Sequence, residues 1–156
     1  MVLIRTQHLP ISLPQAWEFF NDPHNLKTIT PPYMGFDITS EYILNKVYAG
    51  MIITYRVSPL FNIPLRWITE ITHFEAPHFF VDNQKSGPFK IWHHQHFFEE
   101  TPDGIKMTDI VHYSVGFGWL GRLTEKLIVE KRVSEIFDYR FRKLEEIFGK
   151  QISGEN

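Results

Sequence analysis

The hydrophobic pattern of the chain changes from a period of two to helical spacing near residue 118. From Gly35 to about Phe117, apolar residues alternate with polar ones, and turn residues interrupt the alternation. A period of two is typical of half-buried β-strands, and short turns between consecutive strands indicate antiparallel hairpins. Together with an alternating N-terminal segment, the pattern predicts strands at 2–9, 36–43, 50–57, 65–75, 78–85, 90–100 and 105–117.

From about residue 120 the apolar residues recur at helical spacing, which predicts one long helix over about 120–148. A helix of roughly 28 residues would be about 42 Å long, so it needs a broad sheet to cover its apolar face. Charged residues occupy much of the rest of its surface, and we expect Arg140 there. The apolar face consists of Leu123, Leu127, Val133, Phe137, Phe141, Leu144 and Phe148.

Two short helices are expected between the first strand and the second. Ser12 is a plausible N-cap for a helix that ends near Phe20, and a second helix between residues 22 and 31 contains Leu26 and Ile29. This order of elements predicts a grip-like α+β arrangement, with a curved seven-stranded antiparallel sheet around a long C-terminal helix. We expect one domain over 1–150 and a flexible tail over 151–156. Because such a sheet cannot press flat against one helix, a ligand cavity is expected between them.

Composition excludes several classes of function. The 156 residues carry a formal net charge of −2, which argues against nucleic-acid binding because phosphate neutralisation needs excess Lys and Arg. The absence of cysteine excludes disulfides, thiolate catalysis, iron–sulfur clusters and Cys-type zinc sites. The sequence shows no signal peptide and no apolar run of about 18 residues, so we expect a cytoplasmic protein without a membrane helix.

The turn near Asp103-Gly104 determines which side chains share a face of the last hairpin. A two-residue turn there predicts that Phe98 lies opposite Asp109 and His96 opposite Val111. Any even-numbered loop keeps the same residues on one face, and we expect that face to point inward because its aromatic side chains need cover. The face carries Trp92, His94, His96, Phe98, Asp109, Val111, Tyr113 and Val115.

A turn at Ala76-Pro77 sets a second hairpin. The sequence leaves open which of its two faces is internal; Trp67 lies on the face that also carries Asp82. The predicted pairs are Glu75 with His78, His73 with Phe80, Ile71 with Asp82, and Thr69 with Gln84.

Two histidines and one carboxylate, His94, His96 and Asp109, are the strongest candidates for chemistry. They could ligate Zn²⁺ or Fe²⁺, act as an acid–base group, form the polar wall of a ligand cavity, or form a structural hydrogen-bonded network. The aromatic surroundings favour the last two, so we expect no metal and no cofactor. The apolar loop that contains Leu60 and Phe61 either covers a cavity mouth or folds back onto the core.

Several short motifs, in this order and spacing, resemble the START-like (SRPBCC) ligand-binding domains over about residues 3–148. The resemblance is greatest to a bacterial subgroup often described as cell-division-inhibitor-like. It implies the helix-grip fold and a cavity for a hydrophobic small molecule. The motifs are Pro14-x-Ala16-Trp17-x-Phe19-Phe20, Asp22-Pro23-x-Asn25-Leu26, Thr30-Pro31-Pro32, Pro64-Leu65-Arg66-Trp67-x-Thr69-Glu70-Ile71, Phe80-Val81-Asp82-x-Gln84, Gly87-Pro88-Phe89, Trp92-x-His94-x-His96-x-Phe98, Phe117-Gly118-x-Leu120-Gly121 and Ile136-Phe137-x-Tyr139-Arg140.

The leading hypothesis is therefore a protein that binds or carries a lipid, an aromatic compound or a polyketide-like molecule, without catalysis. The alternatives are a polyketide cyclase or dehydratase with acid–base residues in the cavity, and an interaction protein with a collapsed cavity. A pocket of several hundred Å³ would favour the first two. The sequence leaves a homo-oligomer open. The expected ligand-binding residues are Trp67, Trp92, His94, His96, Phe98, Asp109, Tyr113, Phe137 and Phe141.

Overall fold

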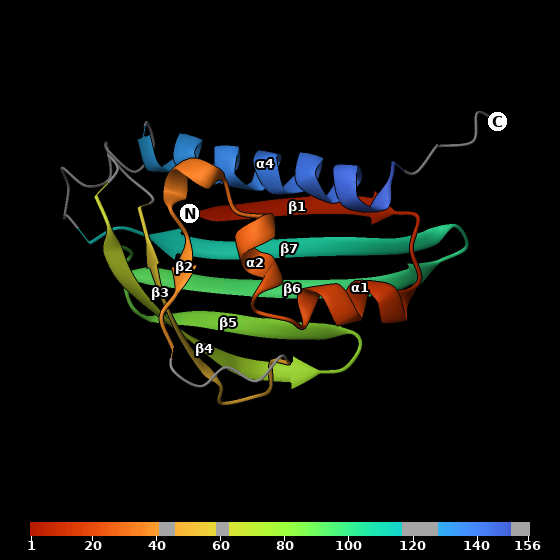
Figure 1. Ribbon diagram of the computed structural model, residues 1–156, viewed down its shortest axis with the longest axis horizontal. Coiled ribbons are helices and arrows are strands. Elements are labelled where there is room, and N and C mark those ends of the chain that lie inside the picture. The colour runs from red at the N-terminus through yellow and green to blue at the C-terminus, as the bar shows by residue number, and fades with distance from the viewer. Residues whose placement is uncertain (41–45, 59–62, 117–127, 151–156) are drawn as a thin grey trace.

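A computed structural model describes residues 1–40, 46–58, 63–116 and 128–150 of the chain. Within these ranges, seven strands form one antiparallel sheet in the order β1-β7-β6-β5-β4-β3-β2 (Figure 1). The predicted α+β helix-grip class is confirmed. The strands are β1 (Val2–Leu9), β2 (Asp37–Ile38), β3 (Ile52–Val57), β4 (Leu65–Glu75), β5 (Phe79–Ser86), β6 (Ile91–Thr101) and β7 (Gly104–Ser114).

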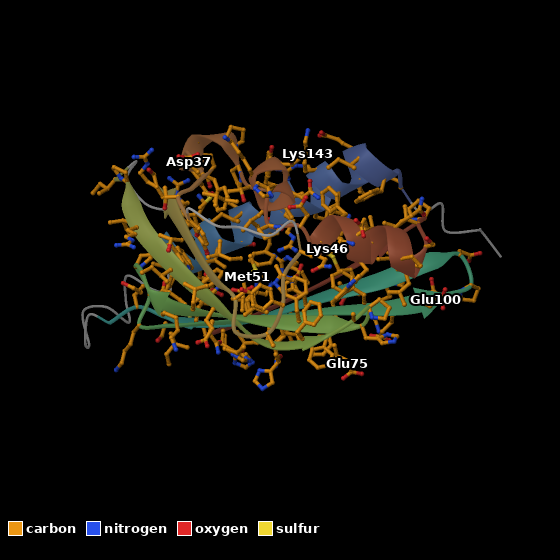
Figure 2. The ribbon with its side chains drawn as sticks, turned by 60° about the horizontal axis from the view of Figure 1, so that its bottom comes forward. Asp37, Lys46, Met51, Glu75, Glu100 and Lys143 are labelled. Carbon is orange, nitrogen blue, oxygen red and sulfur yellow. The ribbon has the colours of Figure 1, made fainter. Side chains whose placement is uncertain are left out.

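The described helices lie on one face of the sheet, and side chains from both layers point into the space between them (Figure 2). The helices α1 (Leu13–Phe20), α2 (Asn25–Thr28) and η1 (Pro32–Met34) follow β1, and α4 (Glu130–Phe148) follows β7. The predicted N-cap of α1 is confirmed. Ser12 Oγ accepts from the Gln15 backbone N–H, while the Gln15 side chain accepts from the Ser12 backbone N–H. Helix α1 packs against β6 and β7, and α4 against β1.

The apolar face of α4 covers the sheet as the spacing predicts. Val133, Phe137 and Leu144 are buried, and Phe141 is half-buried. The prediction for Arg140 was wrong, because this residue is buried on the same face. Residues 120–127, where the predicted helix begins and where Leu123 and Leu127 lie, are outside the described residues.

The β6–β7 hairpin keeps the predicted faces but shifts its register by two residues. Thr101 pairs with Gly104, so the turn residues are Pro102 and Asp103. Gly104 is a strand residue with φ +143°, and a Cβ atom there would collide with the carbonyl oxygen of Leu9 at the end of β1. The observed pairs replace the predicted ones: His96 lies opposite Asp109, His94 opposite Val111, Phe98 opposite Met107, and Trp92 opposite Tyr113.

The β4–β5 hairpin contains an irregularity that alternation does not reveal. Ile71 pairs with Asp82, as predicted, but His73 pairs with Val81 and not with Phe80. A bulge at this point adds one residue to β4, and His73 is exposed on the outer face. Towards the turn, Glu75 pairs with Phe79, which corrects the predicted pairing with His78, and Thr69 keeps its predicted partner Gln84.

Strand β2 is much shorter than the predicted 36–43. After Ile38, the N–H groups of Thr39 and Ser40 both donate to the Thr54 carbonyl. The Thr54 N–H donates to Ser40 Oγ at 2.6 Å, so a side chain replaces the next bond of the ladder. Residues 41–43, the loop residues Leu60 and Phe61, and the predicted tail over 151–156 lie outside the described residues. No helix in the described ranges is long and apolar enough to cross a membrane.

Candidate functional site

Two adjoining cavities lie between the sheet and the helices. We call them the Trp67 cavity and the Phe20 cavity; residues Leu26, Ile29, Phe36, Tyr55 and Arg140 line both. The other described residues that line the Trp67 cavity are Thr30, Met34, Val57, Trp67, Asp82, Phe89, Trp92, His94, Val133, Ile136 and Phe137. Those that line the Phe20 cavity are Phe19, Phe20, Asp22, Pro23, Asn25, Ile38, Val47, Ile53, Thr69, Ile71, Phe80 and His96.

The cavities are small. The Trp67 cavity has a volume of about 120 Å³ and the Phe20 cavity about 70 Å³. An apolar cavity of about 150 Å³ in another protein accepts benzene. The interior is therefore not filled, but neither of these two cavities reaches several hundred Å³. The size of the Trp67 cavity suits a molecule with a single ring.

A buried charge cluster, formed by Asp82, His94, His96, Asp109 and Arg140, lies at the wall of these cavities. Nε2 of His94 donates to Oδ1 of Asp109 at 2.9 Å, and Nε2 of His96 donates to Oδ2 of Asp82 at 2.9 Å. Each imidazole also has its second nitrogen near the other carboxylate: His96 Nδ1 lies 3.0 Å from Asp109 and His94 Nδ1 lies 3.4 Å from Asp82. The centroids of the two rings are 3.7 Å apart.

The two histidines differ in charge. Burial, together with the positive charge of His96, lowers the pKa of His94 to about 4. Burial alone would lower the pKa of His96 too, but hydrogen bonds to Asp109 and Asp82 outweigh it and raise this pKa above its ordinary value. His94 is therefore neutral and His96 is an imidazolium near pH 6.5. The 3.4 Å distance between His94 Nδ1 and Oδ2 of Asp82 fits an Nδ1 atom that carries no hydrogen.

Both carboxyl groups are ionised. Burial would raise the pKa of Asp109, but the charge of Arg140 and the bonds from the two histidines hold it well below its usual range. Burial opposes the ionisation of Asp82 as well, and the His96 hydrogen bond with the nearby positive charges lowers its pKa. Two carboxylates, one guanidinium and one imidazolium give the cluster a net charge of zero, which is what burial requires.

Arg140 joins the helix to this cluster. Its Nη2 atom lies 3.7 Å from Oδ1 of Asp109, and its guanidinium stands over the rings of Phe20 and Phe137 at 5.5 Å and 5.8 Å. Because Arg140 lines both cavities, it also forms part of the boundary between them.

The metal-ligand set that the described residues offer differs from the one considered in the sequence. Ligand atoms of Asp82, His94 and His96 lie within 4.8 Å of one another. A cation there would have to displace the proton of His96 and would meet the positive charge of Arg140. The cluster is thus better suited to hydrogen bonding than to metal binding.

The predicted ligand-binding residues divide into two groups. Trp67, Trp92, His94 and Phe137 line the Trp67 cavity, and His96 lines the Phe20 cavity. The other four do not line either cavity: Asp109 lies behind His94 and His96; Phe98 packs with Trp17, Phe20 and Phe80; Tyr113 packs with Phe89 and Trp92; and Phe141 is half-buried on α4, where its carbonyl accepts from Gln7.

Sequence reasoning omitted two members of the cluster. Asp82 was placed on the Trp67 face, but neither face of that hairpin could be identified as internal. Arg140 was assigned to solvent, although Val133, Phe137, Arg140 and Leu144 have the spacing i, i+4, i+7 and i+11 of one helical face. This spacing was the signal that could have identified Arg140.

No protein-family model and no curated protein matches the chain. Solved structures share its fold. Protein Ms6760 from Mycobacterium smegmatis aligns with a TM-score of 0.68 and 18% identity over 94% of this chain and 89% of that one. TTHA0849 from Thermus thermophilus aligns with a TM-score of 0.66 and 17% identity over 94% of this chain and 95% of that one.

A plant protein has the same architecture. The ginseng major latex-like protein 151 from Panax ginseng aligns with a TM-score of 0.67 and 15% identity over 95% of this chain and 97% of that one. At these identities the likeness concerns the fold, and the chain therefore has the helix-grip α+β fold of these three proteins.

Proposed function

We propose that the chain binds or carries a hydrophobic small molecule with a single ring in the Trp67 cavity, as a cytoplasmic START-like ligand-binding domain. The observation that carries the proposal is a cavity of about 120 Å³ with aromatic walls between the sheet and α4. A well-packed interior leaves few voids larger than a water molecule, because each void forfeits dispersion contacts. A ligand that fills the cavity restores these dispersion contacts and stabilises the folded protein.

Tryptophan fluorescence tests the proposal on the full chain, because Trp67 and Trp92 both line the cavity. We expect added p-xylene to change the tryptophan emission until the signal saturates. Calorimetry should give one bound p-xylene per chain. Val133→Phe should abolish this response, because Val133 lines the cavity and a larger side chain would fill it. Leu144→Met is the matched control: Leu144 is buried on the same helix but does not line the cavity.

Two results would contradict the proposal. One is a titration with no saturable signal, and the other is a Val133→Phe variant that folds and still binds p-xylene with the original affinity. Native mass spectrometry of the protein purified from cells, compared with its organic extract, would then identify any ligand that is carried.

A polyketide cyclase or dehydratase is the second candidate. It is supported by one observation: His94 and Asp82, whose pKa values are both shifted by their surroundings, line the same cavity. Asp109→Asn separates the two candidates. In a carrier it weakens ligand binding with no reaction to lose, whereas in an enzyme it abolishes turnover of a bound substrate and largely preserves binding.

A further inference from the structure

The two oxygens of the Asp82 carboxylate have different surroundings. Oδ2 lies 2.9 Å from His96 Nε2 and 3.4 Å from His94 Nδ1. Oδ1 receives no hydrogen bond from any residue that the structure describes. Asp82 also lines the Trp67 cavity and keeps 15% of its side chain accessible, whereas the Asp109 side chain keeps 2% and does not line it. Asp82 thus presents an ionised acceptor to the cavity.

Two of the side chains that line the same cavity carry a polar atom without a partner. Nε1 of Trp67 and Nε of Arg140 are buried donors without an acceptor among the described residues. Both side chains line the Trp67 cavity, and Arg140 keeps only 7% of its surface exposed. A buried donor without a partner costs free energy that a ligand oxygen would restore.

The charge of the cluster limits what kind of polar group the ligand carries. The cluster is neutral with His96 protonated, so an anionic or a cationic ligand would leave an uncompensated charge in the interior. The complementary group is a neutral one that donates to a carboxylate and accepts from an N–H. A hydroxyl group does both, with one hydrogen and two lone pairs.

The remaining walls of the cavity are aromatic. The rings of Trp67 and Trp92 meet edge to face at 5.2 Å, and Phe89 lies 5.5 Å from Trp67. Such a site favours a flat ring over an alkyl chain. We propose that the Trp67 cavity selects a small neutral phenol, whose hydroxyl donates to Oδ1 of Asp82 and whose oxygen faces the unpartnered donors of the wall. This inference rests on the proposed function, for which it names the ligand class.

Calorimetry with three para-substituted toluenes tests the inference. These are p-cresol, which has a hydroxyl donor; 4-methylanisole, which keeps the oxygen without the donor; and p-xylene, which has neither. p-Xylene matches p-cresol in size, and 4-methylanisole is larger by one methyl group. We expect p-cresol to bind about tenfold more tightly than 4-methylanisole, because a hydrogen bond to a charged group contributes about that factor. p-Xylene should bind no more tightly than 4-methylanisole.

Two pairs of variants locate the interaction. Asp82→Asn and Asp109→Asn remove the same charge from the same cluster, but only the first changes the carboxylate that lines the cavity. The preference for p-cresol should fall about tenfold in Asp82→Asn and persist in Asp109→Asn, even where overall affinity weakens. Trp67→Phe should reduce the preference for p-cresol over p-xylene about threefold and leave the preference over 4-methylanisole, which keeps the ligand oxygen. Trp92→Phe should change the affinity for all three ligands alike.

The outcomes separate the phenol assignment from the proposed binding function. Equal binding of the three ligands, or a preference for p-cresol that survives in folded Asp82→Asn, would overturn the phenol assignment while the binding function stands. Binding of none of the three would overturn both.

Discussion

Nε2 of His94 lies 2.9 Å from Oδ1 of Asp109, although the strand register places Asp109 opposite His96. The same diagonal arrangement recurs one strand away, where His96 bonds to Asp82 while Asp82 lies opposite His94. The second nitrogen of each ring lies near the carboxylate directly opposite, so each imidazole lies between two carboxylates. Strands β5, β6 and β7 are therefore connected through a single network, in which the protonation of one ring disfavours that of the other.

The opposite pKa shifts of the two histidines predict a stability maximum near pH 6.5. The pKa of His94 falls from 6.5 to about 4 on folding, so the unfolded chain binds the extra proton below pH 6.5 and stability declines by about 3 kcal/mol towards pH 4. His96 has a raised pKa in the folded state, so its contribution is present below pH 6.5 and is lost as the pH rises through the folded-state pKa.

Urea unfolding between pH 4 and pH 9 measures this dependence. The variant His94→Gln should flatten the acid side of the curve and leave the alkaline side. An acid side that persists unchanged in His94→Gln would show that another group is responsible.

Removal of Arg140 should destabilise the fold strongly. In Arg140→Met, two buried carboxylates face one imidazolium, and the free energy of unfolding should fall by about 3–5 kcal/mol. Asp109→Asn in the Arg140→Met background restores neutrality. The stability lost by the double variant should therefore be smaller than the sum of the losses of the two single variants, by about 1 kcal/mol or more. Arg132→Met, which removes an exposed ion pair with Glu135, should change stability by less than about 1 kcal/mol. Additive losses in the Arg140–Asp109 cycle would contradict the network.

NMR titration of the histidine rings tests the cluster directly. Asp109→Asn should lower the pKa of His96, because it removes a carboxylate that stabilises the imidazolium. Asp82→Asn should do the same, since His96 bonds to both carboxylates. The ring signals of His8 provide an internal reference from outside the cluster. A His96 titration that does not respond to Asp109→Asn would mean that the two residues do not interact.

Gly104 is expected to be far less tolerant of substitution than Gly50. Both have positive φ angles, +143° and +90°, so both variants carry backbone strain of about 1 kcal/mol or more. A Cβ at Gly104 would also collide with the Leu9 carbonyl, whereas nothing lies within 4 Å of one at Gly50. Thermal unfolding of Gly104→Ala and Gly50→Ala should therefore show a larger loss at Gly104, by about 2 kcal/mol. Equal losses would rule out the steric explanation.

The periodicity of the sequence was sufficient for the class of fold and for the faces of the last hairpin. A period of two assigns alternate residues to opposite faces of a strand whatever the loop length, as long as that length is even. For this reason Trp92, His94, His96 and Asp109 share the inward face although the predicted register was wrong by two residues. The apolar spacing of α4 likewise identified its buried side.

The composition of the site was decided by tertiary structure. Gly104, the first residue of β7, lies against Leu9 of β1, which is distant in the chain. The bulge after Ile71 has no signature in the alternation of β4. Arg140 has the spacing of a buried residue, but a charged side chain is rarely buried unless opposite charges lie close to it. Those charges, on Asp82 and Asp109, come from β5 and β7. Local patterns determine which way a side chain faces, whereas only the packed sheet and helix determine which partners it meets.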